Sequence, residues 1–365
     1  MDVYFNENIY CLLNAKNPFY NKKDISQIDI ISFIGLLFNK SYAVDKFDIL
    51  NKYSIYKLSV KEEPQPVLNT IITSSSFREV SYNVYNDISK NIKYPPHIMW
   101  SGGVDSTYTL IMFLKFFNIK NVHVIFNEDS IEENPIFYEK LLHILPSNNF
   151  HFYRKEKFEP YMSQFSEATI IASQCADQLF GSVVNQRYPN LYFLPWKEAF
   201  THLPQLLNVF ISKHHLYYLI SLLEDYFSHF DIEIKLFCEA IWFLNFSHKW
   251  IYVRNEMGMI LSNNISNNIV NFYDDVRFQQ WSIHNMNKIS QHHQIETKYY
   301  KYDIKKEIYD FDKNYDYFTL KGKISSKYRI WDKSNFIHIY SSKGYNKYCI
   351  QNKHIQRIIL DSIQR

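Results

Sequence analysis

The sequence predicts an α/β protein built on a parallel sheet with helices on both faces. Two observations support this class. Short apolar runs alternate with longer amphipathic stretches after the Pro95-Pro96 pair, which is typical of βα units. The stretch from about residue 200 onward has mostly helical periodicity. We therefore expect a small N-terminal α+β domain at 1–94 and a larger domain at 95–365 with a helical C-terminal part.

The N-terminal region combines strand and helix patterns. Alternating polar and apolar residues predict strands, apolar residues at helical spacing predict helices, and Pro95-Pro96 ends the last helix. The expected elements are a strand pair around 6–8, a helix at 28–38, a strand at 53–60, a connector at 62–66 and a helix at 78–93.

The larger domain begins with the repeated βα pattern. We expect strands at 97–100, 122–126, 150–153 and 169–172, and helices at 105–117, 132–145, 161–165, 216–230 and 232–255. Right-handed crossovers between parallel strands bring the carboxyl ends of the strands to one edge of the sheet, where ligands bind. The residues that follow these strands are therefore the first candidates for a functional site.

Composition favours a soluble, cytoplasmic protein. Hydrophobic residues make up 46% of the 365 residues, but no run reaches the roughly 18 apolar residues of a membrane span. The N-terminus lacks the basic start and apolar run of a secretory signal, so we expect neither export nor membrane attachment.

Neither cysteines nor histidines suggest a metal site. The four cysteines are scattered and show no C-x-x-C spacing. Adjacent pairs such as His214-His215 and His292-His293 would point to different faces of a helix. We therefore expect no sulfur-held structural metal and no histidine metal site.

Charge is unevenly distributed along the chain. The net charge is only +3, but residues 321–365 carry ten Lys/Arg and two Asp, which gives +8 for this stretch and −5 for the first 320 residues. A basic end of this kind is a solvated tail, a lid over phosphates or a nucleic-acid contact.

The segment 101–107, Ser-Gly-Gly-Val-Asp-Ser-Thr, joins an expected strand to an expected helix. Glycines allow close approach of the backbone to an anion, and the start of a helix presents unpaired N–H groups and the positive end of its dipole. A structural turn with a serine cap is the alternative. The candidate phosphate-binding residues are Ser101, Gly102, Gly103, Asp105, Ser106 and Thr107.

This segment resembles the pyrophosphatase loop of the N-type ATP pyrophosphatases, whose fold is the adenine nucleotide alpha hydrolase-like fold. These enzymes cleave ATP between its α and β phosphates and transfer AMP. The resemblance implies ATP as co-substrate and Mg²⁺ as cofactor. Adenine would lie near Trp100 and Phe126, unless these two aromatic residues belong to the core.

A second segment, 172–181, is similar to the S-G-E-G-x-D-E-x-F-G stretch of asparagine synthetase-like domains. Asp177 matches, and Asp105 and Asp177 are therefore the expected Mg²⁺ ligands, because each follows a strand and offers carboxylate oxygens. Gln174 and Gln178 stand where the family has glutamates. Both are expected substrate-binding residues, and Gln174 is also a catalytic candidate. An amide still forms hydrogen bonds but cannot act as a base, so the two glutamines indicate altered handling of substrate or nucleophile.

Weaker matches follow in the family's order. The turn at 271–275 resembles the family's P-F-x-D and supplies Asp274 as a substrate-binding candidate, and 298–311 resembles the next helix. Lys321-Gly322-Lys323 is similar to the R-x-K segment, which implies that Lys323, or alternatively Lys321, carries positive charge to the departing pyrophosphate. The resemblance covers roughly residues 90–330.

The resemblance implies an AMP-forming ligase that adenylates a carboxylate of a small molecule or peptide and forms an amide with ammonia or an amine. Position two is Asp2 rather than the cysteine of a glutaminase domain, so free ammonia, a substrate amine or a partner would supply nitrogen. Lasso-peptide cyclases are the nearest functional analogy. A tRNA-modifying enzyme and a non-catalytic nucleotide-binding protein remain alternatives, and residues 1–90 could bind a partner protein.

Overall fold

The computed structural model describes residues 30–38, 45–53, 75–154, 161–181, 189–206, 211–251, 253–254, 268–292 and 300–320. The chain forms two compact units. The helical unit contains Met1–Ser74, Cys175–Glu256 and Gln279–Glu296, and the sheet unit contains Ser75–Gln174, Met257–Phe278 and Thr297–Arg365. The expected domain boundary at 94/95 falls inside the sheet unit. The expected strand pair around 6–8 and the connector at 62–66 lie outside the described residues, as does the strand expected at 53–60 apart from Tyr53, which ends the short 3-10 helix Asn51–Tyr53.

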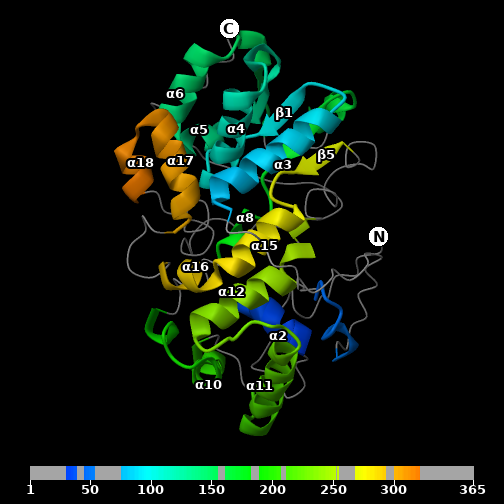
Figure 1. The fold of residues 1–365 in the computed structure, drawn as a ribbon, viewed down its shortest axis with the longest axis vertical. Coiled ribbons are helices and arrows are strands. Elements are labelled where there is room, and N and C mark those ends of the chain that lie inside the picture. Colours follow the sequence, from blue (N-terminus) through cyan, green and yellow to red (C-terminus); the bar gives the residue numbers. More distant parts are fainter. Residues whose placement is uncertain are drawn as a thin grey trace, which may run out of the picture. The chain divides into compact units, whose positions relative to one another are not determined.

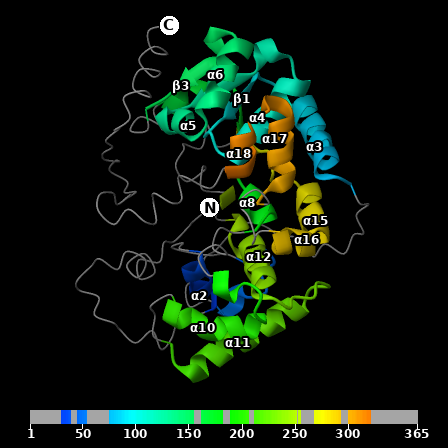
Figure 2. The same cartoon turned by 90° about the vertical axis from the view of Figure 1, so that its left-hand side faces the viewer.

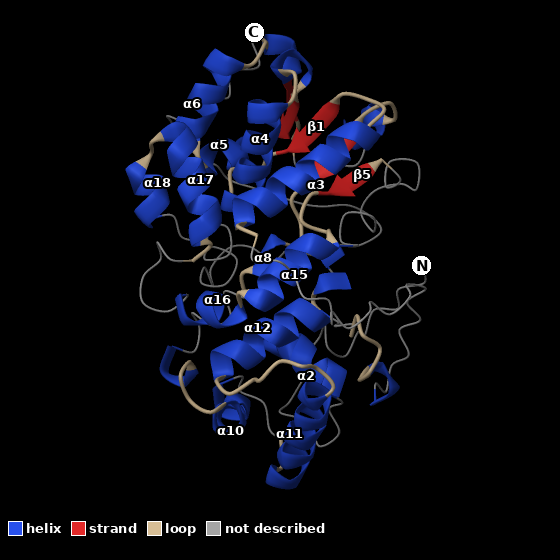
Figure 3. Ribbon diagram, viewed as in Figure 1, coloured by secondary structure: helices blue, strands red, loops and turns tan. Residues whose placement is uncertain are grey.

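Five parallel strands confirm the predicted α/β class. In the order β3-β2-β1-β4-β5 they form one sheet, and Figure 3 shows these strands in red. Their bounds are β1 Pro96–Met99, β2 His123–Phe126, β3 Phe150–Phe152, β4 Thr169–Ala172 and β5 Ile269–Asn271. β5 has no recognisable pattern in the sequence, because three residues are too few to display a strand's alternation.

The strand order reverses beside β1. The chain runs from β1 to β2 and β3 on one side and then returns to β4 and β5 on the other. β1 and β4 pair directly, with Ile98 opposite Ile171. The crevice at the carboxyl ends of two such strands is the usual ligand position in an open parallel sheet.

Helices α3 (Phe77–Asn91) and α4 (Val104–Phe116) pack against each other in the sheet unit (Figure 1). The hydroxyl of Ser76 caps α3 by accepting a hydrogen bond from the N–H of Glu79. Ring contacts such as Tyr85 with Phe113, with centroids 5.2 Å apart, join the two helices. The helix expected at 78–93 therefore belongs to the same compact unit as the sheet.

The prediction of a single helix at 132–145 is wrong in detail, because the structure has two helices in this region. α5 covers Glu128–Glu133 and α6 covers Pro135–Ile144. Asn134 ends the first and caps the second by accepting a hydrogen bond from the N–H of Phe137. Pro135 suits the first position of α6 because it has no N–H to donate to the preceding turn.

Two C-terminal helices complete the described part of the sheet unit. α17 covers Tyr302–Asp312, close to the helix expected at 298–311, and α18 covers Tyr315–Leu320. α17 packs on α4 and on α18. This packing brings residues from the end of the described chain to the glycine-containing segment after β1.

Helices form the described part of the other unit, and α10, α11 and α12 are visible in Figure 2. All residues of α12 are buried, so it forms the core of this unit. α12 is shorter than the expected helix at 232–255, because the Glu239 carboxylate accepts hydrogen bonds from the N–H groups of Lys235 and Leu236 and fixes its start. The helices are α2 Ile30–Leu37, α8 Ala176–Leu179, α10 Trp196–Leu206, α11 Lys213–Ser228, α12 Phe237–His248 and α16 Met286–His292, while α15 Val276–His284 runs from the sheet unit into this one.

Among the described helices, none combines the length and the apolar character that crossing a membrane requires.

Candidate functional site

The segment between β1 and α4 forms a tight loop that requires glycine. Gly102 has a φ of +74°, and a Cβ there would lie 2.3 Å from the carbonyl oxygen of Ser130 in α5. Gly103 has an ordinary φ of −73° and caps α4 without a side chain. A Cβ at Gly103 would meet only the hydroxyl of Ser101, at 3.3 Å. Close contact with α5 therefore explains why position 102 is glycine. Gly103 has no side chain, so it leaves the backbone N–H groups at the start of α4 accessible.

Serine hydroxyls hold the loop in shape. The Ser106 hydroxyl accepts a hydrogen bond from the N–H of Ser101 at 3.0 Å and donates to the carbonyl of Gly103 at 3.2 Å. The two serine hydroxyls are 3.0 Å apart. Ser106 is buried and Ser101 is exposed, so Ser101 is the serine that a ligand can reach. The first N–H groups of α4 have no partner within the helix, and they lie at its positive end.

Trp100 and Phe126 lie in the core behind the loop. Their exposed fractions are 2% and 1%. The Trp100 indole N–H donates to the hydroxyl of Thr107 at 3.0 Å, and its ring contacts Phe137 and Tyr138. The structure therefore supports the core alternative for both aromatic residues, because neither has an exposed face against which adenine could stack. Thr107, which is also buried, positions the indole.

Asp105 in the first turn of α4 forms an ion pair with Lys301. The Lys301 ammonium lies 2.6 Å from each carboxylate oxygen of Asp105. The Lys301 side chain is 3% exposed and that of Asp105 is 24% exposed, so the ammonium is buried and the carboxylate remains accessible. Sequence reasoning singled out Asp105 but missed Lys301. The only signal was its position in the stretch that resembles the family's downstream helix.

Two tyrosines hold the backbone of the loop. The Tyr317 hydroxyl donates to the carbonyl of Gly102 at 3.1 Å, and the Tyr273 hydroxyl donates to the carbonyl of Asp105 at 3.1 Å. Burial raises the pKa of both phenols above the ordinary value, so both stay protonated donors at neutral pH. Sequence reasoning noted the turn containing Tyr273 but assigned neither tyrosine a role.

Polar side chains follow β4 at the same edge of the sheet as the loop. The Ser173 hydroxyl oxygen and the Gln174 side-chain carbonyl oxygen are buried, and neither has a hydrogen-bond partner among the described residues. Buried polar atoms without a hydrogen-bond partner are rare and destabilise a fold. A polar ligand that donates hydrogen bonds to these two oxygens would therefore remove a destabilising contribution. Asp274 lies in the turn after β5, where its N–H donates to the carbonyl of Asn271.

Asp177 and Gln178 belong to the helical unit. Both lie in α8, which begins after Cys175, a residue with a φ of +71° at the place where the family motif has glycine. The Asn245 side chain donates to the carbonyl of Asp177 at 2.8 Å and accepts from the Gln178 amide at 3.4 Å. The use of Asp105 and Asp177 as joint Mg²⁺ ligands stays a prediction, because the two residues lie in different units. Lys321 and Lys323 are outside the described residues.

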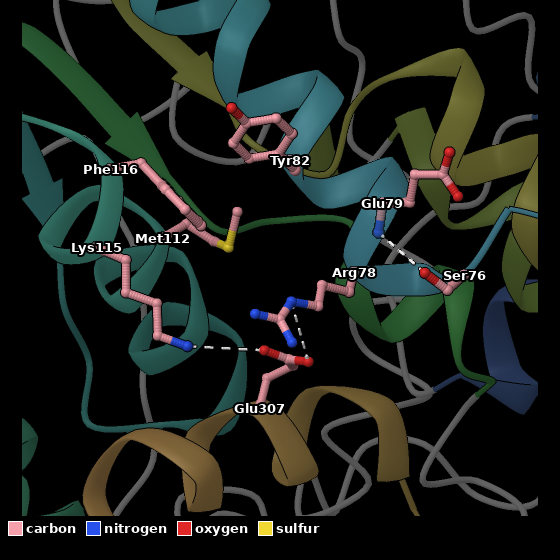
Figure 4. A pocket seen from close by; sticks show the side chains of 8 residues that line it. All are labelled: Ser76, Arg78, Glu79, Tyr82, Met112, Lys115, Phe116 and Glu307. Carbon is pink, nitrogen blue, oxygen red and sulfur yellow. Dashed lines mark hydrogen bonds and ion pairs between the residues drawn. The ribbon is translucent and has the colours of Figure 1, made fainter.

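A separate pocket of 260 Å³ lies between α3, α4 and α17 (Figure 4). Glu307 lies at its base, with its carboxylate 3.8 Å from Arg78 and 3.7 Å from Lys115. Tyr82 and Phe116 form the apolar side of the pocket, with ring centroids 5.0 Å apart. None of the residues predicted for the functional site lines it.

The sequence analysis found no histidine cluster, but three histidines that are far apart in the sequence lie together in the sheet unit. His97, His123 and His151 place one potential ligand atom each within 4.8 Å of the others. They come from three neighbouring strands, and the pairing of the strands, rather than a local sequence motif, brings them together.

Comparisons with protein-family models, with curated proteins and with solved structures found no match for this chain.

Proposed function

We propose that the protein is an ATP-dependent, AMP-forming ligase of the ATP pyrophosphatase class, which adenylates a substrate carboxylate and forms an amide with ammonia or an amine. One observation carries the proposal. A glycine loop at the strand-order reversal leads into a helix whose first-turn carboxylate is paired with a buried lysine.

The loop offers the chemistry that a triphosphate requires. Backbone N–H groups at the start of α4 and the positive end of the helix dipole favour an anion. The ammonium of Lys301 lies next to the first turn and offsets the negative charge of Asp105, so that carboxylate does not repel a phosphate there. Cleavage between the α and β phosphates increases negative charge on the leaving group, and positioned donors and cations lower that barrier most effectively.

Asp105 fits a magnesium ligand. Its carboxylate is 24% exposed, so a cation can reach it, and a carboxylate offers about four lone-pair sites in all. Carboxylate and phosphate oxygens are the ligands that Mg²⁺ prefers, and the ion would offset the charge of the bound triphosphate.

Ser173 and Gln174 support a polar acceptor at the same edge. Their buried, unpartnered oxygens would accept hydrogen bonds from an amine or ammonia, since both nucleophiles carry N–H groups. As a neutral amide, Gln174 cannot take the proton from that nucleophile, so its part in the proposal is positioning.

Pyrophosphate release from ATP, measured over a panel of carboxylates with ammonia or amines, tests the proposal. We expect activity that depends on Mg²⁺ and falls at least a hundredfold in Asp105→Asn and Lys301→Met. Asp310→Asn and Lys313→Ala are matched controls, because both residues are exposed on or next to α17. If no pair of substrates releases pyrophosphate from protein that binds ATP, the ligase proposal is refuted.

That outcome would favour a second candidate, a nucleotide-binding protein without catalysis. Gln178 supports this candidate. It stands where the family has a glutamate, is fully buried and bonds to Asn245 through its amide, so the position carries no charge. ATP binding that is unaffected by Gln178→Glu, together with no turnover in either form, is the result expected of this candidate.

A further inference from the structure

Three histidines gather on one face of the sheet. His97 is in β1, His123 in β2 and His151 in β3, and these strands are consecutive neighbours. His97 lies directly opposite His123 in the register, and His151 lies opposite Ile125, two residues further along β2. Residues two apart in a strand share a face, so all three imidazoles project on the same side.

The three rings are in direct contact. The centroids of His97 and His123 are 4.4 Å apart with nearly parallel planes. Nδ1 of His123 and Nε2 of His151 are 2.9 Å apart, and only one hydrogen can lie between them. The potential ligand atoms of the three residues all lie within 4.8 Å of one another. Tetrahedral zinc with Zn–N bonds of about 2.05 Å holds its nitrogens about 3.3 Å apart, so side-chain shifts of about 1.5 Å or less would complete the arrangement.

A backbone carbonyl orients the first ring. Nδ1 of His97 lies 2.9 Å from the carbonyl oxygen of Pro95, and because a carbonyl only accepts, Nδ1 carries the hydrogen. Nε2 of His97 therefore keeps its lone pair. A histidine that donates one N–H to a carbonyl and offers the other nitrogen is the arrangement that surrounds most metal-bound imidazoles.

The site is covered on one side and open on the other. Phe165 packs on the rings of His97 and His151 at centroid distances of 5.1 and 5.3 Å. His97 is buried, whereas His123 and His151 are only partly buried.

We propose that His97, His123 and His151 bind a divalent transition-metal ion, of which zinc is the best fit. Imidazole nitrogen suits zinc, and three protein ligands leave a fourth position for water. On binding, the metal takes the lone pairs of the three rings, and the hydrogen shared by His123 and His151 moves to the other nitrogen of the ring that carries it. The site is independent of the proposed ligase activity, since it lies four residues before the glycine loop, about 13 Å along the strand at 3.3 Å per residue.

Metal uptake by the full chain tests the proposal. Protein freed of metal with a chelator is dialysed against Zn²⁺, and the bound metal is measured by elemental analysis. We expect about one zinc per chain, and at least tenfold weaker binding in His123→Asn and in His151→Asn. His214→Asn and His215→Asn are matched controls, because this pair is in α11 of the other unit, and both should bind zinc as the wild type does.

Cobalt substitution gives a second readout, and the spectrum of the wild-type protein alone already reports which kind of ligand binds the metal. Co²⁺ bound by three imidazoles and water has visible absorption bands of tetrahedral type and lacks the intense near-ultraviolet band of a cobalt–thiolate bond. Wild-type protein should show this spectrum, and the two histidine variants should lose it. Absence of stoichiometric metal, a thiolate spectrum, or undiminished binding in both variants would each overturn the proposal.

Discussion

The ion pair between Asp105 and Lys301 should respond unequally to removal of its two partners. Asp105→Asn removes the negative charge and leaves at most one amide oxygen for an ammonium that is only 3% exposed, whereas Lys301→Met leaves a carboxylate that is 24% exposed. Removing one partner of a buried pair costs about 3 kcal/mol or more. A partly exposed charge regains hydration, so the second change should cost only about 1 kcal/mol.

Hydrogen exchange of the amides in α4 measures this difference, because α4 carries Asp105. At about 1.4 kcal/mol for each factor of ten, Asp105→Asn should speed exchange about a hundredfold and Lys301→Met about fivefold. In the double variant both groups are neutral, so exchange should return to within about fivefold of the wild type. Equal effects of the two single variants, or a larger effect of Lys301→Met, would refute the reasoning.

Three further predictions concern stability. Gly102→Ala should lower the free energy of unfolding by at least about 2 kcal/mol, because φ is +74° and the methyl group would collide with a carbonyl, and it should abolish the proposed ATP binding. Gly103→Ala should be tolerated better, and urea unfolding of the two variants checks the difference in stability. Burial lowers the pKa of His248 to about 4, so the unfolded chain takes up a proton at this residue first as pH falls below 6.5. His248 alone should therefore lower stability by up to about 1.4 kcal/mol per pH unit between pH 6.5 and 4. His248→Asn should flatten that dependence, and an unchanged slope would contradict the assignment. Glu307→Gln should lower the free energy of unfolding by about 1 kcal/mol in low salt and by less in high salt, because it removes the negative charge that Arg78 and Lys115 share. Identical urea unfolding midpoints of variant and wild type in low salt would argue against this ion-pair network.

The sequence was sufficient to predict the sheet class and the loop because both depend on neighbouring residues. Alternating apolar runs mark β1 to β4, and Gly102 and Gly103 mark the turn into α4. Asn134 and Pro135 also formed a local signal, a cap followed by a first-position proline, which divides α5 from α6. That boundary could have been predicted from helix-capping chemistry alone.

Other features depend on tertiary packing and left no local pattern. Lys301 reaches Asp105 across 196 positions of the chain, and no spacing rule links two such residues. The histidine cluster arises from the register of three strands, each of which contributes one ring. Trp100 resembled a nucleotide contact because it adjoins the loop, but its place in the core follows from the rings of α6 that cover it.

The shortness of β1 restricts how this sheet can tolerate insertions and deletions. Its four residues carry His97 near the start and lead into the glycine loop, and both neighbouring strands are paired to it. A single residue inserted after His97 would turn either that ring or every later side chain to the opposite face, since facing alternates with each residue. Length changes in this protein should therefore be accepted in the connections between strands and rejected within β1, where one added residue would turn either His97 or the approach to the glycine loop to the wrong face.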